Sequence, residues 1–198
     1  KHLAQRSIEL ASEDAGAAHT IDVATHAIAS HNPGPWLDAQ WIDDEHVALI
    51  GSASANVAGL DLQPTSAAWT LEGAIAACDV SCDRTRLALA TSTGDVVLFD
   101  TATRRALART RVRPGSATSI VLSPRGDRAV LCGTAETGTA KLWNPGAELV
   151  DLPGIGSRTS LRVRFSPDGA TVATGGDATV VRLWAAPARS LVRTLALP

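Results

Sequence analysis

Four copies of one pattern follow one another along the sequence, at intervals of about 40 residues, and a partial copy precedes them. The last copy opens with the turn Ser166-Pro167-Asp168-Gly169, continues through an apolar run and ends with Val180-Val181-Arg182-Leu183-Trp184. The same order begins again at Ser123, at Ser81 and at Ile42. A repeat of this length indicates that each copy forms one supersecondary unit, and that neighbouring units bury each other's apolar faces.

Spacing within the copies supports a common register. The step from the first turn residue to the large apolar residue that closes the third strand is 18, 18, 20 and 18 residues. The closing residues are Ile21, Leu60, Phe99, Trp143 and Trp184. Length differences fall in turns, where an insertion costs little free energy. We therefore expect five equivalent units.

Each full copy is predicted to form four short β-strands. In the last copy we expect strands at 161–166, 171–174, 180–184 and 190–195, separated by turns rich in Pro, Gly, Asp and Ala. Strands such as 96–99 are apolar on both faces, which suits a small sheet with a neighbour on either side. The pattern predicts an all-β fold, a β-propeller of four-stranded antiparallel blades.

The repeats resemble those of the WD-repeat (WD40) β-propeller family. The turn 166–169 and the strand Val181-Arg182-Leu183-Trp184 are the most typical marks, and the closing dipeptide of the family survives in part, as Phe99-Asp100 and Trp143-Asn144. The Gly-His pair that ties many blades of this family has no counterpart here. Blades without it are expected to depend more on apolar packing.

The repeats divide the chain into a partial blade, 1–33, and four blades, 34–73, 74–115, 116–157 and 158–198. The partial blade is predicted to lack its innermost strand, so about 4.7 blades are present. The resemblance implies a ring of seven blades. We therefore expect the remaining blades, or an effector domain, in the same or another chain. A self-closed ring of five blades is the alternative.

Composition limits the partners. A net charge of −2 speaks against a general nucleic-acid footprint, and no apolar run approaches the roughly 18 residues that span a bilayer. Two lysines against sixteen arginines, with abundant alanine, suggest a GC-rich bacterial genome. No secretory leader is visible, and an odd number of cysteines argues against a disulfide framework. A cytoplasmic location is expected.

Residues with catalytic potential are scarce. Cys78, Cys82 and Cys132 contain no Cys-x-x-Cys pair, and His19 and His26 lack the spacing of metal ligands. The acidic run 43–45 occupies the place of the Ser-Pro-Asp-Gly turn, so it is interpreted as a solvated turn. We predict no catalytic residue, no metal site and no cofactor.

Binding through loops and the mouth of the channel is the remaining possibility. Trp36 follows Pro-Gly-Pro at a blade entrance, where it either anchors a partner or packs between blades. On an extended strand Arg109, Arg111 and Arg113 point one way, as they would to hold a carboxylate or phosphate. Solvated charge that protects an edge strand is the alternative. Arg158 belongs to a loop on the same predicted face.

Comparison of the copies adds three residues. Asp38, Ala77, Ser119 and Arg162 occupy one place on the innermost strand, and Gln40, Asp79, Val121 and Arg164 lie two residues further on. A core position would stay apolar, so this variation suggests recognition by Asp38, Arg162 and Arg164. The candidate partner-binding residues are therefore Trp36, Asp38, Arg111, Arg113, Arg158, Arg162 and Arg164.

Three classes of function fit these observations. The resemblance implies a non-catalytic protein-protein interaction, scaffold or sensor module of a larger bacterial protein, with a protein or peptide partner. An enzymatic propeller, a hydrolase or dehydrogenase whose site lies in missing blades, is one alternative. A small carbohydrate-binding propeller is the other. All three share the fold, so the fold cannot choose among them.

Overall fold

The computed structural model describes residues 6–11, 17–22, 28–32, 36–59, 61–133, 140–152, 162–175, 180–188 and 190–196. For the strands before residue 33 and for residues 64–68 it describes the backbone only. Every regular element in the described residues is a β-strand, which confirms the predicted all-β class. By contacts the chain divides into two compact units, residues 1–75 and 76–198.

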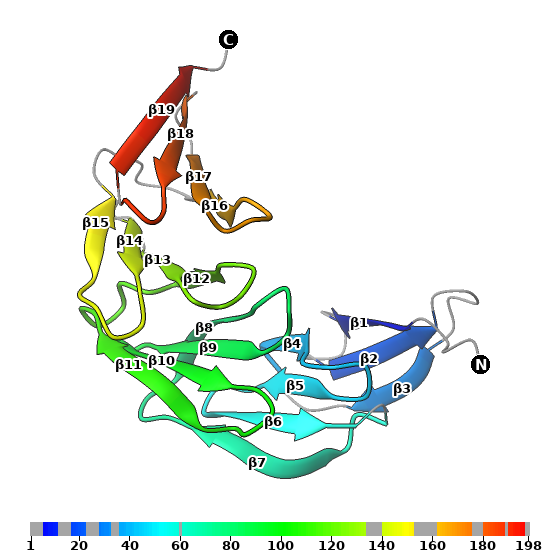
Figure 1. Ribbon diagram of the computed structural model, residues 1–198. Coiled ribbons are helices and arrows are strands. Elements are labelled where there is room, and N and C mark those ends of the chain that lie inside the picture. The colour runs from blue at the N-terminus through cyan, green and yellow to red at the C-terminus, as the bar shows by residue number, and fades with distance from the viewer. Residues whose placement is uncertain are drawn as a thin grey trace. The chain divides into compact units, whose positions relative to one another are not determined.

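The first unit contains two antiparallel sheets. The three-stranded sheet has the order β1-β2-β3, and the four-stranded sheet has the order β4-β5-β6-β7 (Figure 1). Their strands are β1 (Arg6–Ala11), β2 (Ala17–Asp22), β3 (Ile28–Asn32), β4 (Asp38–Trp41), β5 (Val47–Ile50), β6 (Ser54–Ala58) and β7 (Pro64–Thr70). Within each sheet every strand pairs with the next one along the chain, as expected for a propeller blade.

The second unit contains three four-stranded sheets of the same topology. The strands are β8 (Ile75–Val80), β9 (Arg86–Thr91), β10 (Asp95–Asp100), β11 (Ala106–Arg111), β12 (Ser119–Leu122), β13 (Ala129–Cys132), β14 (Ala140–Trp143), β15 (Val150–Leu152), β16 (Arg162–Phe165), β17 (Thr171–Gly175), β18 (Val180–Ala185) and β19 (Ser190–Ala196). The four strands predicted for the last copy are confirmed to within one residue at each described end.

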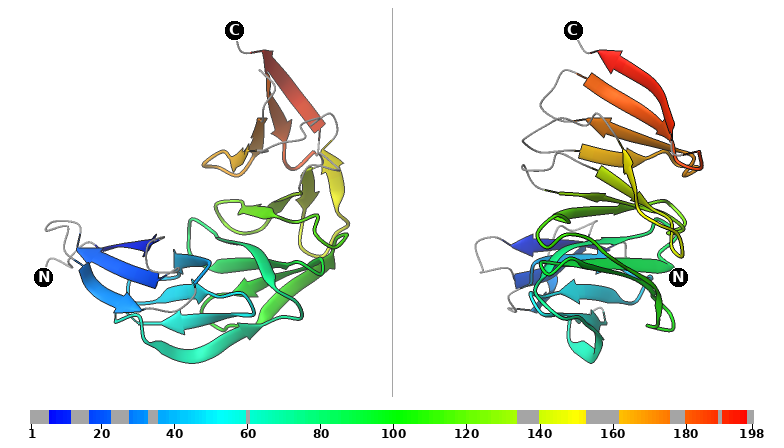
Figure 2. Two further views of the ribbon diagram at one scale, coloured as in Figure 1. Left: turned by 180° about the vertical axis from the view of Figure 1, so that it is seen from behind. Right: turned by 90° about the vertical axis from the view of Figure 1, so that its left-hand side faces the viewer.

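Within this unit the sheet β12–β15 lies between the other two sheets (Figures 1 and 2). One apolar cluster joins it to β8–β11 and includes Leu98, Leu131 and Trp143. A second cluster joins it to β16–β19 and includes Leu142, Val172 and Trp184. The sheet β12–β15 is therefore apolar on both faces because it packs against a neighbour on each, as predicted.

The strand register confirms the repeat and corrects one copy. Leu87 pairs with Phe99, Ala129 with Trp143 and Val172 with Trp184, so these three closing residues are equivalent. In the copy 34–73 the residue at this place is Ala58, paired with Val47, and not the predicted Leu60, which lies outside the described residues.

Two shorter turns explain this error. The Ile42 amide donates to the carbonyl of His46, four residues on, whereas the Ser81 amide donates to Arg86, five residues on. The next turn is also one residue shorter, because Ile50 pairs with Ala55 while Ala90 pairs with Val96. Together the two deletions move the closing residue by two positions, from the predicted Leu60 to Ala58.

A recurring bulge places the partial blade. In three sheets the pairing of the fourth strand shifts by one residue just before Ile21, Phe99 and Trp184 of the facing strand. The fourth strand therefore contains one extra residue without a pairing partner at this point. This makes β2 equivalent to the third strands β10 and β18. The three described strands of the first sheet thus correspond to the second, third and fourth strands of a blade. A bulge in the outermost strand also hinders edge-to-edge pairing with another molecule.

Candidate functional site

The predicted cation row on β11 binds a carboxylate of its own sheet. Asp95 begins β10 opposite Arg111, and its carboxylate accepts from Arg109 at 3.0 Å and from Arg111 at 3.1 Å. The Asp95 side chain is only 3% exposed, while those of Arg109 and Arg111 are 58% and 67% exposed. One carboxylate balances one of the two guanidinium groups. Arg109 and Arg111 therefore bind Asp95 within the sheet and leave one positive charge unbalanced.

The same contacts fix the charge state of Asp95. Its hydrogen bond from Arg109 lowers the pKa of the carboxyl below the ordinary value of 3.8, and Arg111 adds to this against the opposing effect of desolvation. A carboxyl whose pKa is lowered by folding stabilises the folded state above its unfolded pKa, and that stabilisation is lost as the pH falls through the folded pKa.

A pH-dependent stability difference should follow. We expect Asp95→Asn to lower the melting temperature at pH 7, because the two guanidinium groups lose their counter-charge. The deficit relative to the unsubstituted protein should shrink as the pH falls below about 3.8, where Asp95 of the unfolded chain takes up a proton, and should vanish below the lower pKa of folded Asp95. Thermal melts of both proteins at a series of pH values measure this. A deficit that stays constant down to about pH 3 would contradict the assignment.

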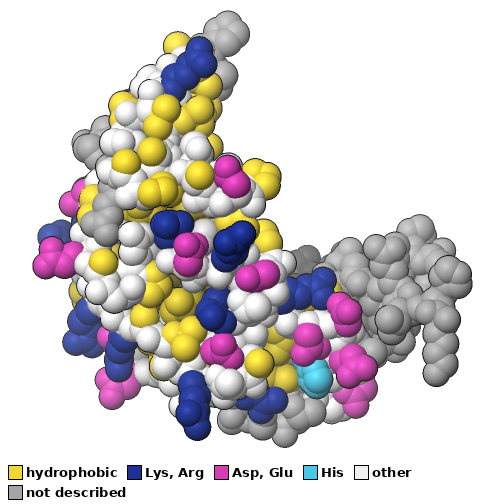
Figure 3. Space-filling model, in the orientation of Figure 1, with side chains coloured by type: hydrophobic (Ala, Val, Ile, Leu, Met, Phe, Trp, Pro, Cys, Tyr) yellow, Lys and Arg dark blue, Asp and Glu magenta, His cyan; other side chains and the backbone are white. Residues whose placement is uncertain are grey.

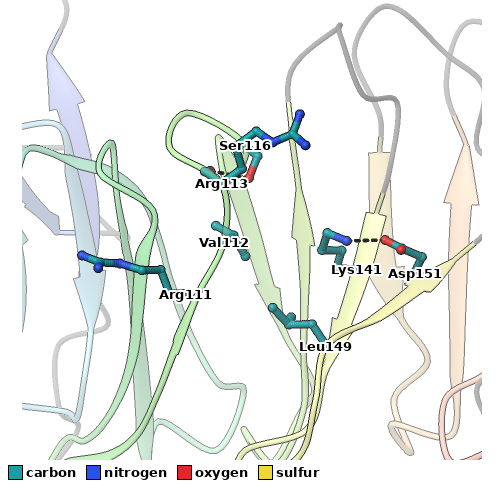
Figure 4. A pocket seen from close by; sticks show the side chains of 7 residues that line it. All are labelled: Arg111, Val112, Arg113, Ser116, Lys141, Leu149 and Asp151. Atoms are coloured by element: carbon teal, nitrogen blue, oxygen red, sulfur yellow. Dashed lines mark hydrogen bonds and ion pairs between the residues drawn. The ribbon is translucent and has the colours of Figure 1, made fainter.

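A groove opens beside this row, between the sheets β8–β11 and β12–β15. It has a volume of about 540 Å³ and is lined by Arg111, Val112, Arg113 and Ser116 on one side and by Lys141, Leu149 and Asp151 on the other. In Figure 4 Val112 lies below Arg113 and Ser116, Leu149 lies below Lys141, and the Lys141–Asp151 ion pair lies across from Arg113 and Ser116. Arg111 points away from the other lining side chains, and its guanidinium binds Asp95.

The loop that carries Arg113 is held by backbone hydrogen bonds. The Val112 amide donates to Gly94 at 2.8 Å, and the Gly115 amide donates to Ser92 at 3.0 Å. The Ser116 hydroxyl and amide both donate to the carbonyl of Arg113, at 2.6 Å and 3.0 Å. This side of the groove is therefore fixed by the turn that precedes β10. A fixed loop loses little conformational entropy when a ligand binds.

Arg162 and Arg164 occupy a different surface, on one face of the last sheet. Arg164 is in register with Ala173, Leu183 and Arg193, and Arg162 with Gly175, Val181 and Leu195. Both arginines are exposed, and in the described part of the chain neither joins an ion pair. The Arg164 guanidinium donates to the Val163 carbonyl at 2.9 Å.

The equivalent face of the preceding sheet is buried. There the two rows read Val121, Val130, Leu142, Val150 and Ser119, Cys132, Ala140, Leu152. Val130, Cys132, Ala140, Leu142 and Leu152 are at most 3% exposed, because the sheet β16–β19 covers them. On the last sheet Ala173, Val181 and Leu183 are only half-buried. Figure 3 shows apolar side chains at the surface over this sheet. Leu191, which pairs with Trp184 and so lies on the opposite face, and Val192 at the bulge are 49% and 64% exposed.

The structure therefore changes the interpretation of the innermost-strand positions. The predicted equivalence of Asp38, Ser119 and Arg162 is confirmed, since they pair with Ile50, Cys132 and Gly175. However, Ser119 lies on the face that meets the next sheet, and Arg162 lies on the equivalent face of the last sheet. Asp79, in the row of Arg164, shows this directly, because its carboxylate accepts the amide of Leu122 from the next sheet at 2.7 Å.

The remaining candidates are placed as follows. Trp36 is half-buried and packs against the apolar cluster of Val47, Leu49, Ala58 and Leu62. Asp38 accepts from the Ala39 amide at 2.8 Å and from the Gln40 side chain at 2.9 Å. Arg158 lies outside the described residues. Asp43 caps its own exposed turn by accepting from the amides of Glu45 and His46, as predicted for the acidic run.

Two observations bear on chemistry. Burial raises the pKa of the Cys132 thiol to about 12, so it stays protonated and packs as an apolar side chain. Over the described ranges, no three His, Cys, Asp or Glu side chains gather as metal ligands would. Those ranges also contain no helix with the length and apolarity needed to cross a membrane.

Sequence patterns missed the groove, because Lys141 and Asp151 come from a different copy than Arg113.

Among solved structures, the chain is similar to the β-propeller domain of Cps50 (Swd1) from Myceliophteria thermophila. The TM-score is 0.69 at 16% sequence identity, and the match covers 98% of this chain and 70% of that one. This confirms the predicted β-propeller fold. Neither a protein-family model nor a curated protein matches the sequence. Because 1330 chains of solved structures match, the fold leaves the function open.

Proposed function

We propose that the chain is a non-catalytic protein-protein interaction module, a portion of a WD-repeat β-propeller within a larger protein. One observation carries this proposal. The last sheet presents Arg162, Arg164 and Arg193 on a half-buried apolar face, whose counterpart in the preceding sheet is covered by another sheet. A surface that combines apolar area with unpaired arginine is typical of an interface that a protein partner completes.

The chemistry of this face defines the partner. Its rows hold three arginines and no acidic residue: Arg162, Gly175, Val181 and Leu195 in one, and Arg164, Ala173, Leu183 and Arg193 in the other. A protein surface with apolar side chains and carboxylates matches it best, because each buried guanidinium needs a hydrogen-bonding anion. We assign this surface to the remaining blades or to an effector domain, in the same or another chain.

The finer parts of the proposal have separate support. The resemblance in the turns and third strands favours the WD-repeat family and a scaffold or sensor role. The surplus of arginine over lysine favours a bacterial source, and the three cysteines, which form no disulfide, favour the cytoplasm.

Affinity capture tests the proposal. We expect the immobilised 198-residue chain to enrich a specific protein from a lysate of its source, and Arg162→Glu with Arg164→Glu to reduce that enrichment by about tenfold or more. The matched control is Arg125→Glu, an exposed arginine in the turn between β12 and β13. Thermal melts establish that each variant stays folded. A folded double variant that retains full binding would refute the assignment of this face.

A further inference from the structure

The groove beside β11 has the chemistry of an anion site. Among the described residues Arg113 joins no ion pair, while the neighbouring cations are Lys141, paired with Asp151, and Arg109 and Arg111, which share Asp95. Four cationic and two anionic side chains leave a net charge of +2 in this region, although the whole chain carries −2. The positive charge is therefore local.

Its donors suit phosphate better than a carboxylate. Arg113 offers a planar fork of N–H groups and Lys141 an ammonium group, while the single O–H of Ser116 already donates to the Arg113 carbonyl. Lys141 already pairs with the carboxylate of Asp151. A carboxylate ligand would therefore gain little binding free energy from Lys141. A phosphate monoester brings close to two negative charges and three acceptor oxygens.

The apolar part of the groove favours a peptide over free phosphate as the ligand. Leu149 is half-buried and lines the groove, whereas Val112 is 8% exposed and belongs to the apolar cluster between the two sheets, so Leu149 offers the apolar surface. Inorganic phosphate would leave this apolar surface without a partner. A peptide would cover it with a side chain next to the phosphorylated residue, and a groove of about 540 Å³ has room for both groups.

We infer that the groove formed by Val112, Arg113, Ser116, Lys141 and Leu149 binds a phosphorylated serine or threonine of a partner protein together with a flanking apolar side chain. This inference rests on the proposed interaction function and gives it a ligand class at a second surface. Arg113 binds the phosphate as a fork, Lys141 contributes charge shared with Asp151, and the backbone bonds of the loop hold Arg113 in place.

Binding of a degenerate peptide library with a central phosphoserine tests the inference, measured by fluorescence anisotropy on the 198-residue chain. We expect the phosphorylated library to bind at least about tenfold more tightly than the same library with serine, and more tightly than with glutamate. Arg113→Ala should weaken phosphopeptide binding about tenfold, and Arg113→Lys less, because the charge stays while the fork is lost. The matched control, Arg125→Ala, should change nothing, since Arg125 lies outside the groove.

Four outcomes would overturn the inference. These are equal binding of the phosphorylated and serine libraries, unchanged binding by a folded Arg113→Ala protein, inorganic phosphate that binds as tightly as the peptides, and preferential binding to phosphatidylcholine vesicles containing phosphatidylinositol 4-phosphate. Failure here remains distinguishable from failure of the proposed function. Capture of the protein partner depends on Arg162 and Arg164, which do not line the groove.

Discussion

Replacing Gly94 with alanine is expected to lower the free energy of unfolding by about 2–5 kcal/mol. Two effects add at this position. Gly94 has a φ of +91°, which costs a residue with a side chain about 1–2 kcal/mol. A Cβ atom would also lie 2.1 Å from the carbonyl oxygen of Val112, so the loop that carries Arg113 would have to move. Urea unfolding followed by circular dichroism measures the change.

Two other glycines separate these effects. Gly115 has a φ of +72° with nothing within 4 Å of an added Cβ, so Gly115→Ala should show the conformational cost alone, about 1–2 kcal/mol. At Gly133 no positive φ occurs, but an added Cβ would meet the Ser116 carbonyl at 2.4 Å, so Gly133→Ala should show the steric cost alone, about 1–3 kcal/mol. If all three substitutions cost the same, the close approach of Gly94 to Val112 is not what requires glycine.

Removing the Trp143 side chain should destabilise the protein by about 3–5 kcal/mol. Trp143 is 1% exposed and belongs to the apolar cluster that joins the sheets β8–β11 and β12–β15. Trp143→Ala leaves a cavity between two sheets whose backbones are fixed by their own hydrogen bonds, so the space cannot close by local collapse. Thermal and urea unfolding report the loss.

Leu107→Ala is the matched control for this prediction. Leu107 is 50% exposed at the bulge of the edge strand β11, and its truncation should change stability by no more than about 0.5 kcal/mol. A loss below about 1 kcal/mol for Trp143→Ala would mean that the cluster does not hold the two sheets together. Comparable losses for both variants would show that a side chain buried between the sheets contributes no more to stability than an exposed one.

The face of the last sheet and the groove are the two surfaces at which we propose that other proteins bind. The face with Arg162 and Arg164 continues the stacking direction of the sheets, so it suits a partner that is itself a packed surface. The groove at Arg113 and Lys141 is narrower and charged, which suits a short segment with a single anionic group. Variants at the two sites therefore test independent contacts.

The turns show why the repeat was readable. Ser81, Ser123 and Ser166 each accept the amide at the start of the second strand and donate to an aspartate within the turn. Neighbouring turns also stack, since the Asp83 amide donates to Pro124 at 3.1 Å. These bonds are local in sequence, so they favour a serine and a nearby aspartate in the turns of these three copies. In the copy 34–73 Ile42 replaces the serine and the turn is shorter, and there the predicted register was wrong.

By itself the sequence determined what depends on neighbours along the chain: strands, turns, the period and the equivalence of Asp38, Ser119 and Arg162. The tertiary structure decided everything that depends on pairing across strands and packing between sheets. Only the pairing of Asp95 with Arg111 revealed that the arginine row has an internal anion. Likewise, only sheet packing brought Arg113 near Lys141, because residues far apart in the chain become neighbours through burial of apolar faces, which spacing does not record.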